Sequence, residues 1–364
     1  MKKAVVYLVV LFLVDLAIAQ DQQKSNTKVV LITLDGFRWQ ELFSGADPLL
    51  VANKQYVHDT TDLKERFWKA NSQERREALL PFIWKEVAKM GQIHGNRSLG
   101  SKVDLTNTMW FSYPGYNEIL SGKADDARIN SNDKIPNPNT TVLEIANNEP
   151  RYNGKVAAFG SWDVFPSIVN EERSGIPVNA GFKLAQGSTL TEREKLLNEL
   201  QPKVPSPWGS VRFDGFTHYY ALEYMKKEHP ELVFISYGET DDFAHDGDYA
   251  AYLKSANTTD ALIKELWYFT QKDAFYKDNT LFIVTTDHGR GTDPLETWKS
   301  HGEKISDAGG VWILMFGKNV AANGEITIEE QLYSSQIAPT IAKALNLTTG
   351  LGSMENKAIE ISDN

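Results

Sequence analysis

The 364-residue chain contains no cysteine. This absence excludes disulfides, thiolate metal sites and a lipid-modified N-terminal cysteine. Any metal ion must therefore be held by carboxylate, imidazole or hydroxyl groups, a donor set that suits Zn²⁺, Mn²⁺ or Mg²⁺. With 41% hydrophobic residues, a chain of this length can bury a large core without covalent cross-links.

The chain also lacks an excess of basic residues, since its net charge is −10 and its isoelectric point is near 5.3. We therefore expect no nucleic-acid-binding surface. Neither G-x-x-x-x-G-K nor G-x-G-x-x-G occurs, which argues against a nucleotide phosphate loop. No apolar run of about 18 residues follows the N-terminal segment, so we expect no membrane anchor in the mature protein.

The N-terminus has the three parts of a secretory signal peptide. Lys2 and Lys3 supply positive charge, residues 4–14 are apolar, and residues 17–19 form an A-x-A cleavage pattern. We predict that residues 1–19 are removed and that the protein is exported, to the periplasm or out of the cell. Residues 20–364 would then form a single domain.

Short apolar runs separated by helical patterns indicate the fold. The runs are typical of strands buried on both faces and cover 29–34, 155–160, 232–236, 280–284 and 309–316. Helical patterns include 74–90, 248–270 and 334–345. This alternation predicts an α/β fold with a doubly wound, mostly parallel sheet flanked by helices. The mixed segment at about 163–215 is predicted to be a small cap insertion over the site.

Candidate metal ligands stand where the predicted strands end. Asp35 follows the first run, and Asp287 and His288 follow the run 280–284. Open α/β sheets bind ligands at the carboxyl ends of their strands. Asp241 and His245 follow another strand and are four residues apart, so on a helix both side chains lie on one face and can share a cation.

Each of these motifs has an alternative interpretation. Asp35 precedes a glycine and could simply be a turn residue. Near Asp241 and His245, the acidic residues Glu239, Asp242 and Asp246 are alternative ligands. His301 enters as a candidate because it is the last histidine after His288.

Ser112 is a candidate nucleophile. It precedes a helical pattern, and the positive field at a helix N-terminus, together with a metal ion, favours an alkoxide. The alternative is a helix-capping serine, and Thr106 and Thr108 are rival hydroxyls. Downstream, Asn130 and Asn132 lie in a polar loop and could either bind a substrate oxygen or shape a turn.

Together these motifs resemble the alkaline phosphatase superfamily, on the branch of type I phosphodiesterases and nucleotide pyrophosphatases. L-D-G-F-R at 34–38 is similar to the first metal motif of that family, and S-Y-P-G-Y at 112–116 to its nucleophile motif. T-D-D-F-A-H at 240–245 resembles D-x-x-G-H, with Ala244 in place of glycine, and T-D-H-G at 286–289 resembles D-H-G. The similarity is scattered over about 29–347.

The resemblance implies an alkaline-phosphatase-like metallohydrolase with two divalent metal ions, zinc by preference and manganese as the alternative. It implies that one ion is held by Asp35, Ser112, Asp287 and His288, and the other by Asp241, His245 and His301. Asn132, or in its place Asn130, would contact a phosphate oxygen. Ser112 would form a phosphoseryl intermediate with a small phosphorylated substrate, either a phosphomonoester or a phosphodiester.

Three other functions remain open. A sulfatase is one alternative, although Tyr116 replaces the arginine of the sulfatase motif S-x-P-x-R. A phosphotransferase of the same superfamily, similar to phosphoglycerate mutase, is another, and a non-catalytic binding protein is the third. Only 13 residues separate His288 from His301, which predicts a reduced cap on that side.

Overall fold

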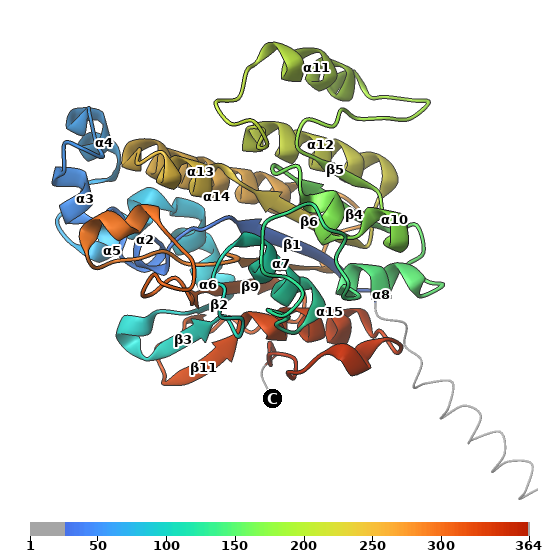
Figure 1. Cartoon of the computed structure of the whole chain (residues 1–364). Coiled ribbons are helices and arrows are strands. Elements are labelled where there is room, and N and C mark those ends of the chain that lie inside the picture. Colours follow the sequence, from blue (N-terminus) through green and yellow to red (C-terminus); the bar gives the residue numbers. More distant parts are fainter. Residues whose placement is uncertain (1–25, 363–364) are drawn as a thin grey trace, which may run out of the picture.

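The computed structural model describes residues 26–362, so the predicted signal peptide, residues 1–19, lies outside the described residues. An eight-stranded sheet forms the centre, in the order β10-β2-β9-β7-β1-β6-β4-β5 (Figure 1). Its strands are β1 Lys28–Leu34, β2 Gly91–His94, β4 Val156–Gly160, β5 Val178–Ala180, β6 Leu232–Tyr237, β7 Thr280–Thr285, β9 Ile313–Gly317 and β10 Gly324–Glu325. A second sheet has the order β11-β3-β8, formed by β3 Ser101–Asp104, β8 Gly310–Val311 and β11 Glu330–Tyr333.

The middle of the large sheet is parallel. β1 pairs in parallel with both β6 and β7, and β4 continues the parallel part beside β6. β9 runs antiparallel to β7 and to β2. The predicted strand over 309–316 is divided, because at Trp312 the chain passes from β8 in the small sheet to β9 in the large one.

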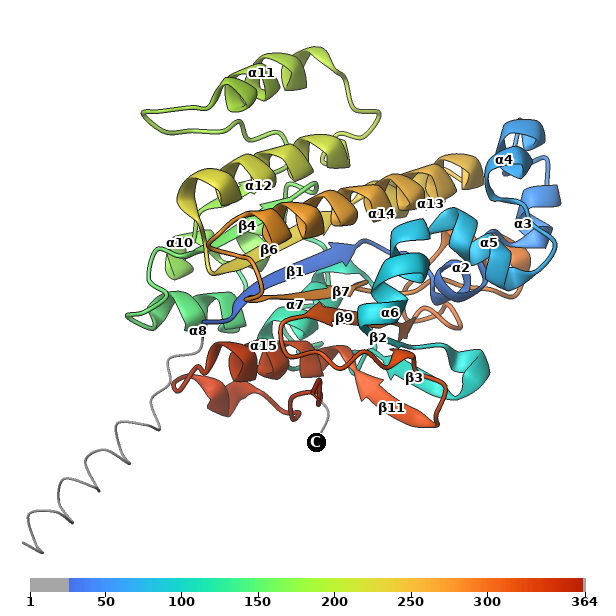
Figure 2. The same ribbon diagram turned by 180° about the vertical axis from the view of Figure 1, so that it is seen from behind.

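Helices cover both faces of the sheet, which explains why its central strands β1, β6 and β7 are mostly apolar and fully buried. Along β1, Val30 and Ile32 enter one core, while Val29 and Leu31 enter the other. The first core contains α12 Asp214–Glu228, α14 Tyr249–Lys272 and the N-terminal helices, and the second contains α7 Ser112–Ser121, α8 Val142–Asn148 and α15 Ile337–Leu345. Figure 2 shows α12 and α14 on one side of β1 and α15 on the other.

The N-terminal helices are α2 Trp39–Ser44, α3 Pro48–Ala52, α4 Thr60–Phe67, α5 Ser72–Leu79 and α6 Ala88–Met90. The helix predicted over 74–90 is interrupted, because α5 ends at Leu79 and a π-helix, η1 Ile83–Val87, follows. Pro81 is the physical reason, since proline disfavours a helical conformation in the residue before it. Leu80 accordingly has φ −127° and ψ 67°. Within residues 26–362, no helix is both long enough and apolar enough to cross a bilayer.

The segment predicted as a cap, 163–215, contains both sheet and non-sheet parts. It includes α9 Phe165–Ile168, α10 Glu171–Ser174 and β5, which pairs with β4 at the sheet edge. Residues 181–213 lie outside the large sheet and carry α11 Glu192–Leu200, which stands above α12 (Figure 1). On the return, Trp208 packs on Phe243 with ring centroids 4.8 Å apart. This part therefore reaches α13 Glu239–His245.

Candidate metal centre and nucleophile

The candidate ligands come from the ends of three adjacent strands. Asp35 follows β1, Asp287 and His288 follow β7, and α13, which carries Asp241 and His245, follows β6. β7, β1 and β6 are neighbours in the centre of the sheet. Because these strands are parallel, their carboxyl ends meet at one edge, and the five side chains are brought together there.

A first group of ligand atoms converges on His288. Its Nε2 atom lies 3.3 Å from Oδ1 of Asp35, 3.6 Å from Oδ2 of Asp287 and 3.4 Å from Oγ of Ser112. All four side chains are buried. Asp35, Asp287 and His288 each offer one ligand atom, and these three atoms all lie within 4.8 Å of one another. This meets the distance requirement for holding one metal ion.

The two carboxylates of this group are each fixed through one oxygen only. The hydroxyl of Tyr116 donates to Oδ2 of Asp35 at 2.8 Å, and the backbone N–H of Gly36 donates to Oδ1 of Asp287 at 3.0 Å. Oδ1 of Asp35 and Oδ2 of Asp287 are buried and accept no hydrogen bond from any residue within 26–362. Burying such oxygens without a partner is costly, and a bound cation removes that cost, so the residues fit a metal ion.

His288 is oriented to offer Nε2 to the group. Its Nδ1 lies 2.9 Å from the carbonyl oxygen of Gly289, which can only accept, so Nδ1 carries a proton. Burial alone would lower the pKa of His288, but the carboxylates of Asp287, Asp35 and Asp241 raise it to about 9. The pKa of Asp287 is raised well above its usual range by burial and by the charge of Asp35. These shifts show how strongly the carboxylates attract positive charge.

A second group forms around His301. Its Nε2 lies 2.9 Å from Nε2 of His245 and 3.7 Å from Oδ1 of Asp241, while Oδ2 of Asp241 lies 3.3 Å from His245. Two imidazole nitrogens that face each other this closely suit a shared cation. Burial, together with the charges of His288 and Arg290, lowers the pKa of His301 well below its usual range. The neutral ring therefore keeps a lone pair for a metal ion.

His288 lies between the two groups, since its Nε2 is also 3.7 Å from Oδ1 of Asp241. By distance alone, Asp241, His288 and His301 can also hold a metal ion. One nitrogen lone pair binds one cation, however, and the shorter distance assigns His288 to Asp35. His245 is in neither three-residue group, but its Nε2 lies 2.9 Å from His301 and 3.3 Å from Asp241, so it is near enough to be the ligand that the resemblance implies for the second ion.

Ser112 is the first residue of α7, and the structure excludes the capping alternative. The N-cap position belongs to Phe111, and no side chain caps this helix. The rival hydroxyl of Thr108 donates to Asp126 instead. Gly115 explains how α7 comes so near the ligands, because a Cβ atom there would lie 2.2 Å from the carbonyl oxygen of Asp287.

The two candidate asparagines differ in how they are held. Oδ1 of Asn132 accepts from the backbone N–H of Tyr113 at 3.0 Å, directly beside the candidate nucleophile. This bond fixes the amide group and leaves its Nδ2 as a donor. Both asparagines are exposed, but the bond to Tyr113 is made by Asn132 and not by Asn130.

The alternative acidic ligands have other roles. Oε1 of Glu239 accepts from the backbone N–H of Asp214, and Oδ2 of Asp246 accepts from Trp208. Burial and nearby carboxylates, that of Asp241 first, raise the pKa of Asp242 to about 9. Among the described residues, none of these three is in a three-residue group that meets the distance requirement for a metal ion. His245 is in no such group either, but unlike these three it faces His301, at 2.9 Å.

The sequence interpretation missed three residues that support the ligands. Tyr116 binds Asp35, and Arg290 binds Asp241. Asp214 accepts from the backbone N–H groups of Gly238 and Glu239 and so fixes the start of α13. Two of them have a signal in the sequence: Tyr116 ends the motif S-Y-P-G-Y, and Arg290 is a charged residue directly after T-D-H-G.

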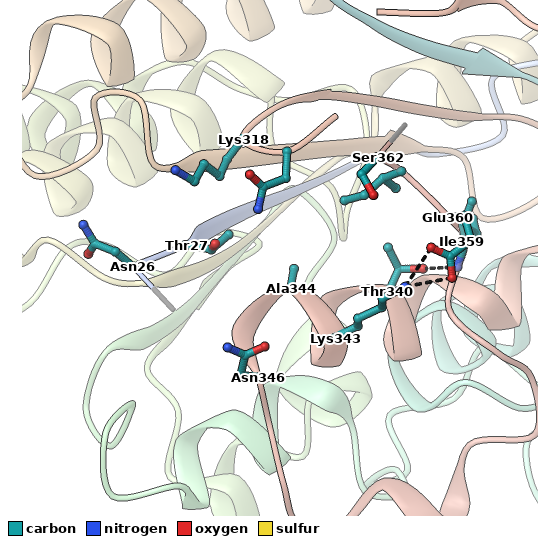
Figure 3. A pocket seen from close by; sticks show the side chains of 12 residues that line it. Asn26, Thr27, Lys318, Thr340, Lys343, Ala344, Asn346, Ile359, Glu360 and Ser362 are labelled. Carbon is teal, nitrogen blue, oxygen red and sulfur yellow. Dashed lines mark hydrogen bonds and ion pairs between the residues drawn. The ribbon is translucent and has the colours of Figure 1, made fainter. Parts of the chain in front are cut away.

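A large cavity lies elsewhere. Its volume is about 550 Å³, and it is lined by residues that include Asn26, Lys318 and Lys343, which Figure 3 labels. It is near the start of β1, whereas the candidate ligands follow the ends of β1, β6 and β7. None of the candidate ligands lines it, so it is distinct from the metal centre.

Comparison with known proteins supports the same family. Residues 194–349 match the sequence model of the Metalloenzyme superfamily. Alkaline phosphatase PafA is similar in structure, with a TM-score of 0.58 and 11% identity over 93% of this chain and 99% of that one. This chain has the fold of the alkaline phosphatase superfamily. The resemblance predicted from the sequence is thereby confirmed, as is the fold class. No curated protein sequence matches the chain.

Two further structures show how varied the relatives of this fold are. Phosphonate monoester hydrolase SpPMH from Silicibacter pomeroyi has a TM-score of 0.55 and 12% identity over 92% of this chain and 76% of that one. Murine ectonucleotide pyrophosphatase/phosphodiesterase 5 has a TM-score of 0.51 and 14% identity over 88% and 96%. A 2-O GAG sulfatase and a lipoteichoic acid synthase are also similar. The fold therefore does not determine the reaction.

The family match coincides with most of the candidate metal centre. The matched residues, 194–349, include the ligands that follow β6 and β7 as well as the last histidine, namely Asp241, His245, Asp287, His288 and His301. The match to a metalloenzyme model agrees with divalent metal binding, and the structure supplies two overlapping groups that meet the distance requirement, Asp35, Asp287 and His288, and Asp241, His288 and His301.

Proposed function

We propose that the chain is an exported two-metal phosphoester hydrolase that acts through a phosphoseryl intermediate on Ser112. One observation carries this proposal. Oγ of Ser112 lies 3.4 Å from Nε2 of His288, where two buried carboxylate oxygens converge without hydrogen-bond partners among the described residues. A hydroxyl at this position can bind a cation and attack phosphorus from the same atom.

The proposed ligands are those of the two groups. Asp35, Ser112, Asp287 and His288 would hold one cation, and Asp241, His245 and His301 the other. This mixed set of carboxylate, imidazole and hydroxyl donors favours Zn²⁺, with Mn²⁺ as the alternative. When bound, two such cations favour the deprotonated hydroxyl and neutralise the charge of the attacking and leaving oxygens.

Ser112 performs the substitution at phosphorus. Its hydroxyl proton passes to solvent, Oγ forms a bond to phosphorus, and the bond to the leaving oxygen breaks. The first turn of α7 places Oγ at a helix N-terminus, whose positive field favours the alkoxide. Nδ2 of Asn132 donates to a non-bridging phosphate oxygen. Water then cleaves the phosphoserine and returns a proton to Ser112.

Tyr116 supports a phosphoester substrate over a sulfate ester. It occupies the position at which the sulfatase motif S-x-P-x-R has arginine. Here the side chain is fully buried, and its hydroxyl donates to Asp35 and accepts from Ser236 at 2.9 Å. A phenol cannot supply the positive charge that an arginine supplies in that motif.

A panel of three nitrophenyl esters tests the proposal. The purified protein, loaded with Zn²⁺ or Mn²⁺, is assayed with nitrophenyl phosphate, bis(nitrophenyl) phosphate and nitrophenyl sulfate. We expect turnover of a phosphoester at least about 100-fold faster than of the sulfate. The Ser112→Ala variant should be at least about 1,000-fold slower than the wild type. A preference for the sulfate, or full activity of Ser112→Ala, would refute the proposal.

A further inference from the structure

Arg290 is buried completely, next to the proposed metal centre, and its guanidinium group is bound on three sides. Nε donates to the carbonyl oxygen of Gly36 at 3.0 Å, and Nη1 donates to that of Lys299 at 2.7 Å. Nη2 donates to the carboxylate of Asp241 and, at 3.2 Å, to its carbonyl oxygen. A single side chain thus contacts three separate segments.

Each of these segments carries a proposed metal ligand. Gly36 follows Asp35, Asp241 is itself a ligand, and Lys299 lies two residues before His301. Arg290 in turn comes two residues after His288. The guanidinium group therefore joins the segment after β1, the start of α13 and the end of η4 Leu295–Lys299 to the segment after β7.

The neighbouring backbone accommodates this arrangement. A Cβ atom on Gly36 would lie 2.9 Å from Nε and Nη2 of Arg290 and 2.9 Å from Oδ1 of Asp241. Gly36 also has φ +57°, a conformation that side chains other than glycine rarely adopt. The turn after β1 thus has room for the guanidinium group only because it contains glycine.

Arginine is the side chain that suits this position. Its planar fork presents donors in several directions at once, whereas an ammonium group is a compact charge on a flexible stem. Two of the three segments are bound through carbonyl oxygens, so charge alone does not explain the contacts. The contacts require the directional donors of the fork.

We propose that Arg290 is the positioning residue that assembles the second metal group, Asp241, His245 and His301. It holds Asp241 through its carboxylate and the segment of His301 through Lys299, and it anchors both to the turn after Asp35. Loss of Arg290 therefore lowers the affinity for one of the two cations and leaves the affinity for the other unchanged. This inference rests on the two-metal centre of the proposed function.

The charge of Arg290 acts in the opposite direction. A fixed positive charge beside Asp241 repels a divalent cation, so an effect of charge alone would make the second cation bind more tightly once Arg290 is removed. Positioning and repulsion therefore predict opposite signs for the same measurement. The substitution Arg290→Met removes both charge and fork, and Arg290→Lys keeps the charge but removes the fork.

Titration of the chelator-treated protein with Co²⁺ measures the two sites without any substrate. Visible absorption and calorimetry report each equivalent that binds, and Zn²⁺ is titrated in parallel. Arg212→Met is the matched control, because Arg212 is equally buried and binds mainly a hydroxyl and backbone or amide oxygens at Thr217, Asn179 and Lys183. None of these partners is a proposed ligand.

We expect two equivalents to bind the wild type and Arg212→Met with similar affinities. In Arg290→Lys and Arg290→Met, one equivalent should keep its affinity, and the second should bind at least about 10-fold more weakly. Unchanged or tighter binding of the second equivalent would overturn the inference. Equal weakening of both equivalents would overturn it as well. Arg290→Lys, the smaller change, decides the matter if Arg290→Met does not fold.

The titration separates this inference from the proposed function. If the wild type binds two equivalents but hydrolyses no phosphoester, the proposed reaction is wrong, and the effect of Arg290 on the second equivalent is still measured. If the wild type binds fewer than two equivalents, the two-metal centre is wrong, and both proposals fail.

Discussion

Nε2 of His245 and Nε2 of His301 face each other at 2.9 Å, although 56 residues separate them in the sequence. Both rings also approach the carboxylate of Asp241, at 3.3 Å and 3.7 Å. His301 is the last histidine in the sequence, and its side chain contacts both other members of the second group.

We therefore expect His301→Ala to lose one of two bound metal ions. Removing a direct ligand should lower the binding affinity for that ion by at least about 100-fold, which is more than the loss of a supporting residue does. Metal content after dialysis, measured by mass spectrometry, checks this. His229→Ala is the control, because His229 is the C-cap residue of α12 and its Nε2 lies 3.4 Å from Asp273, which is not a proposed ligand. Retention of two ions in His301→Ala would contradict the assignment.

Asn132 and Asn130 provide a matched pair. Both are exposed, but Asn132 is fixed by the N–H group of Tyr113 and Asn130 is not. We expect Asn132→Ala to lower kcat/KM for a phosphoester by about 10- to 1,000-fold, because a donor to the phosphate is lost. Asn130→Ala should remain within about 3-fold of the wild type. The reverse order of effects would transfer the role to Asn130.

Tyr116→Phe tests the support of Asp35. The change removes one hydroxyl that donates to Oδ2 of Asp35 and keeps the buried ring. We expect affinity for the first metal ion to fall by about 10- to 100-fold, as is usual for residues that orient metal ligands. Tyr152→Phe is the control, since its hydroxyl donates to the carbonyl oxygen of Leu345. Equal metal affinities in both variants would show that Tyr116 has no such role.

Asp260 gives a prediction on stability. Its buried carboxylate on α14 accepts from the backbone N–H groups of Phe82 and Ile83, at the start of the π-helix η1. Burial raises the pKa of Asp260 from about 3.8 to about 7. The folded protein then binds this proton more tightly than the unfolded chain. Protonation of Asp260 therefore contributes to the free energy of unfolding below about pH 4, and this contribution is lost as the pH rises through 7.

Denaturant unfolding of the wild type and Asp260→Asn at about pH 5 and pH 8 checks this. The difference in unfolding free energy should shift in favour of the variant as the pH rises, because asparagine does not ionise. Asp59→Asn, at the exposed N-cap of α4, serves as the control. A difference between wild type and Asp260→Asn that is independent of pH would contradict the raised pKa.

Much of the sheet was predictable from the sequence. Strands such as β1 and β7 are covered on both faces, so their residues are mostly apolar. Asp35 follows β1 directly, and Asp287 follows β7 after one residue, Thr286. The prediction of one helix over 74–90 is wrong, because the apolar periodicity continues through Pro81 although the backbone at Leu80 is not helical. The division at Trp312 depends on pairing with β3, a contact between distant segments that local pattern does not contain.

The supporting residues could not be predicted for a similar reason. Asp214 acts on α13 through backbone N–H groups of Gly238 and Glu239, and nothing near Asp214 in the sequence shows this contact. Ser112 had a local alternative as a capping residue, which only the helix boundary at Phe111 excludes. Candidate ligands can be recognised in the sequence because they come after predicted strands. The residues that orient them come near the ligands only through tertiary packing.

The most direct test of the two-metal hydrolase is a titration of activity with metal. The protein is stripped with a chelator, dialysed, and assayed with the better of the two nitrophenyl phosphoesters while Zn²⁺ or Mn²⁺ is added. We predict negligible activity without metal and full activity only when the second equivalent per chain has bound. Full activity of the stripped protein or at one equivalent, or no hydrolysis with two equivalents bound, would contradict the account.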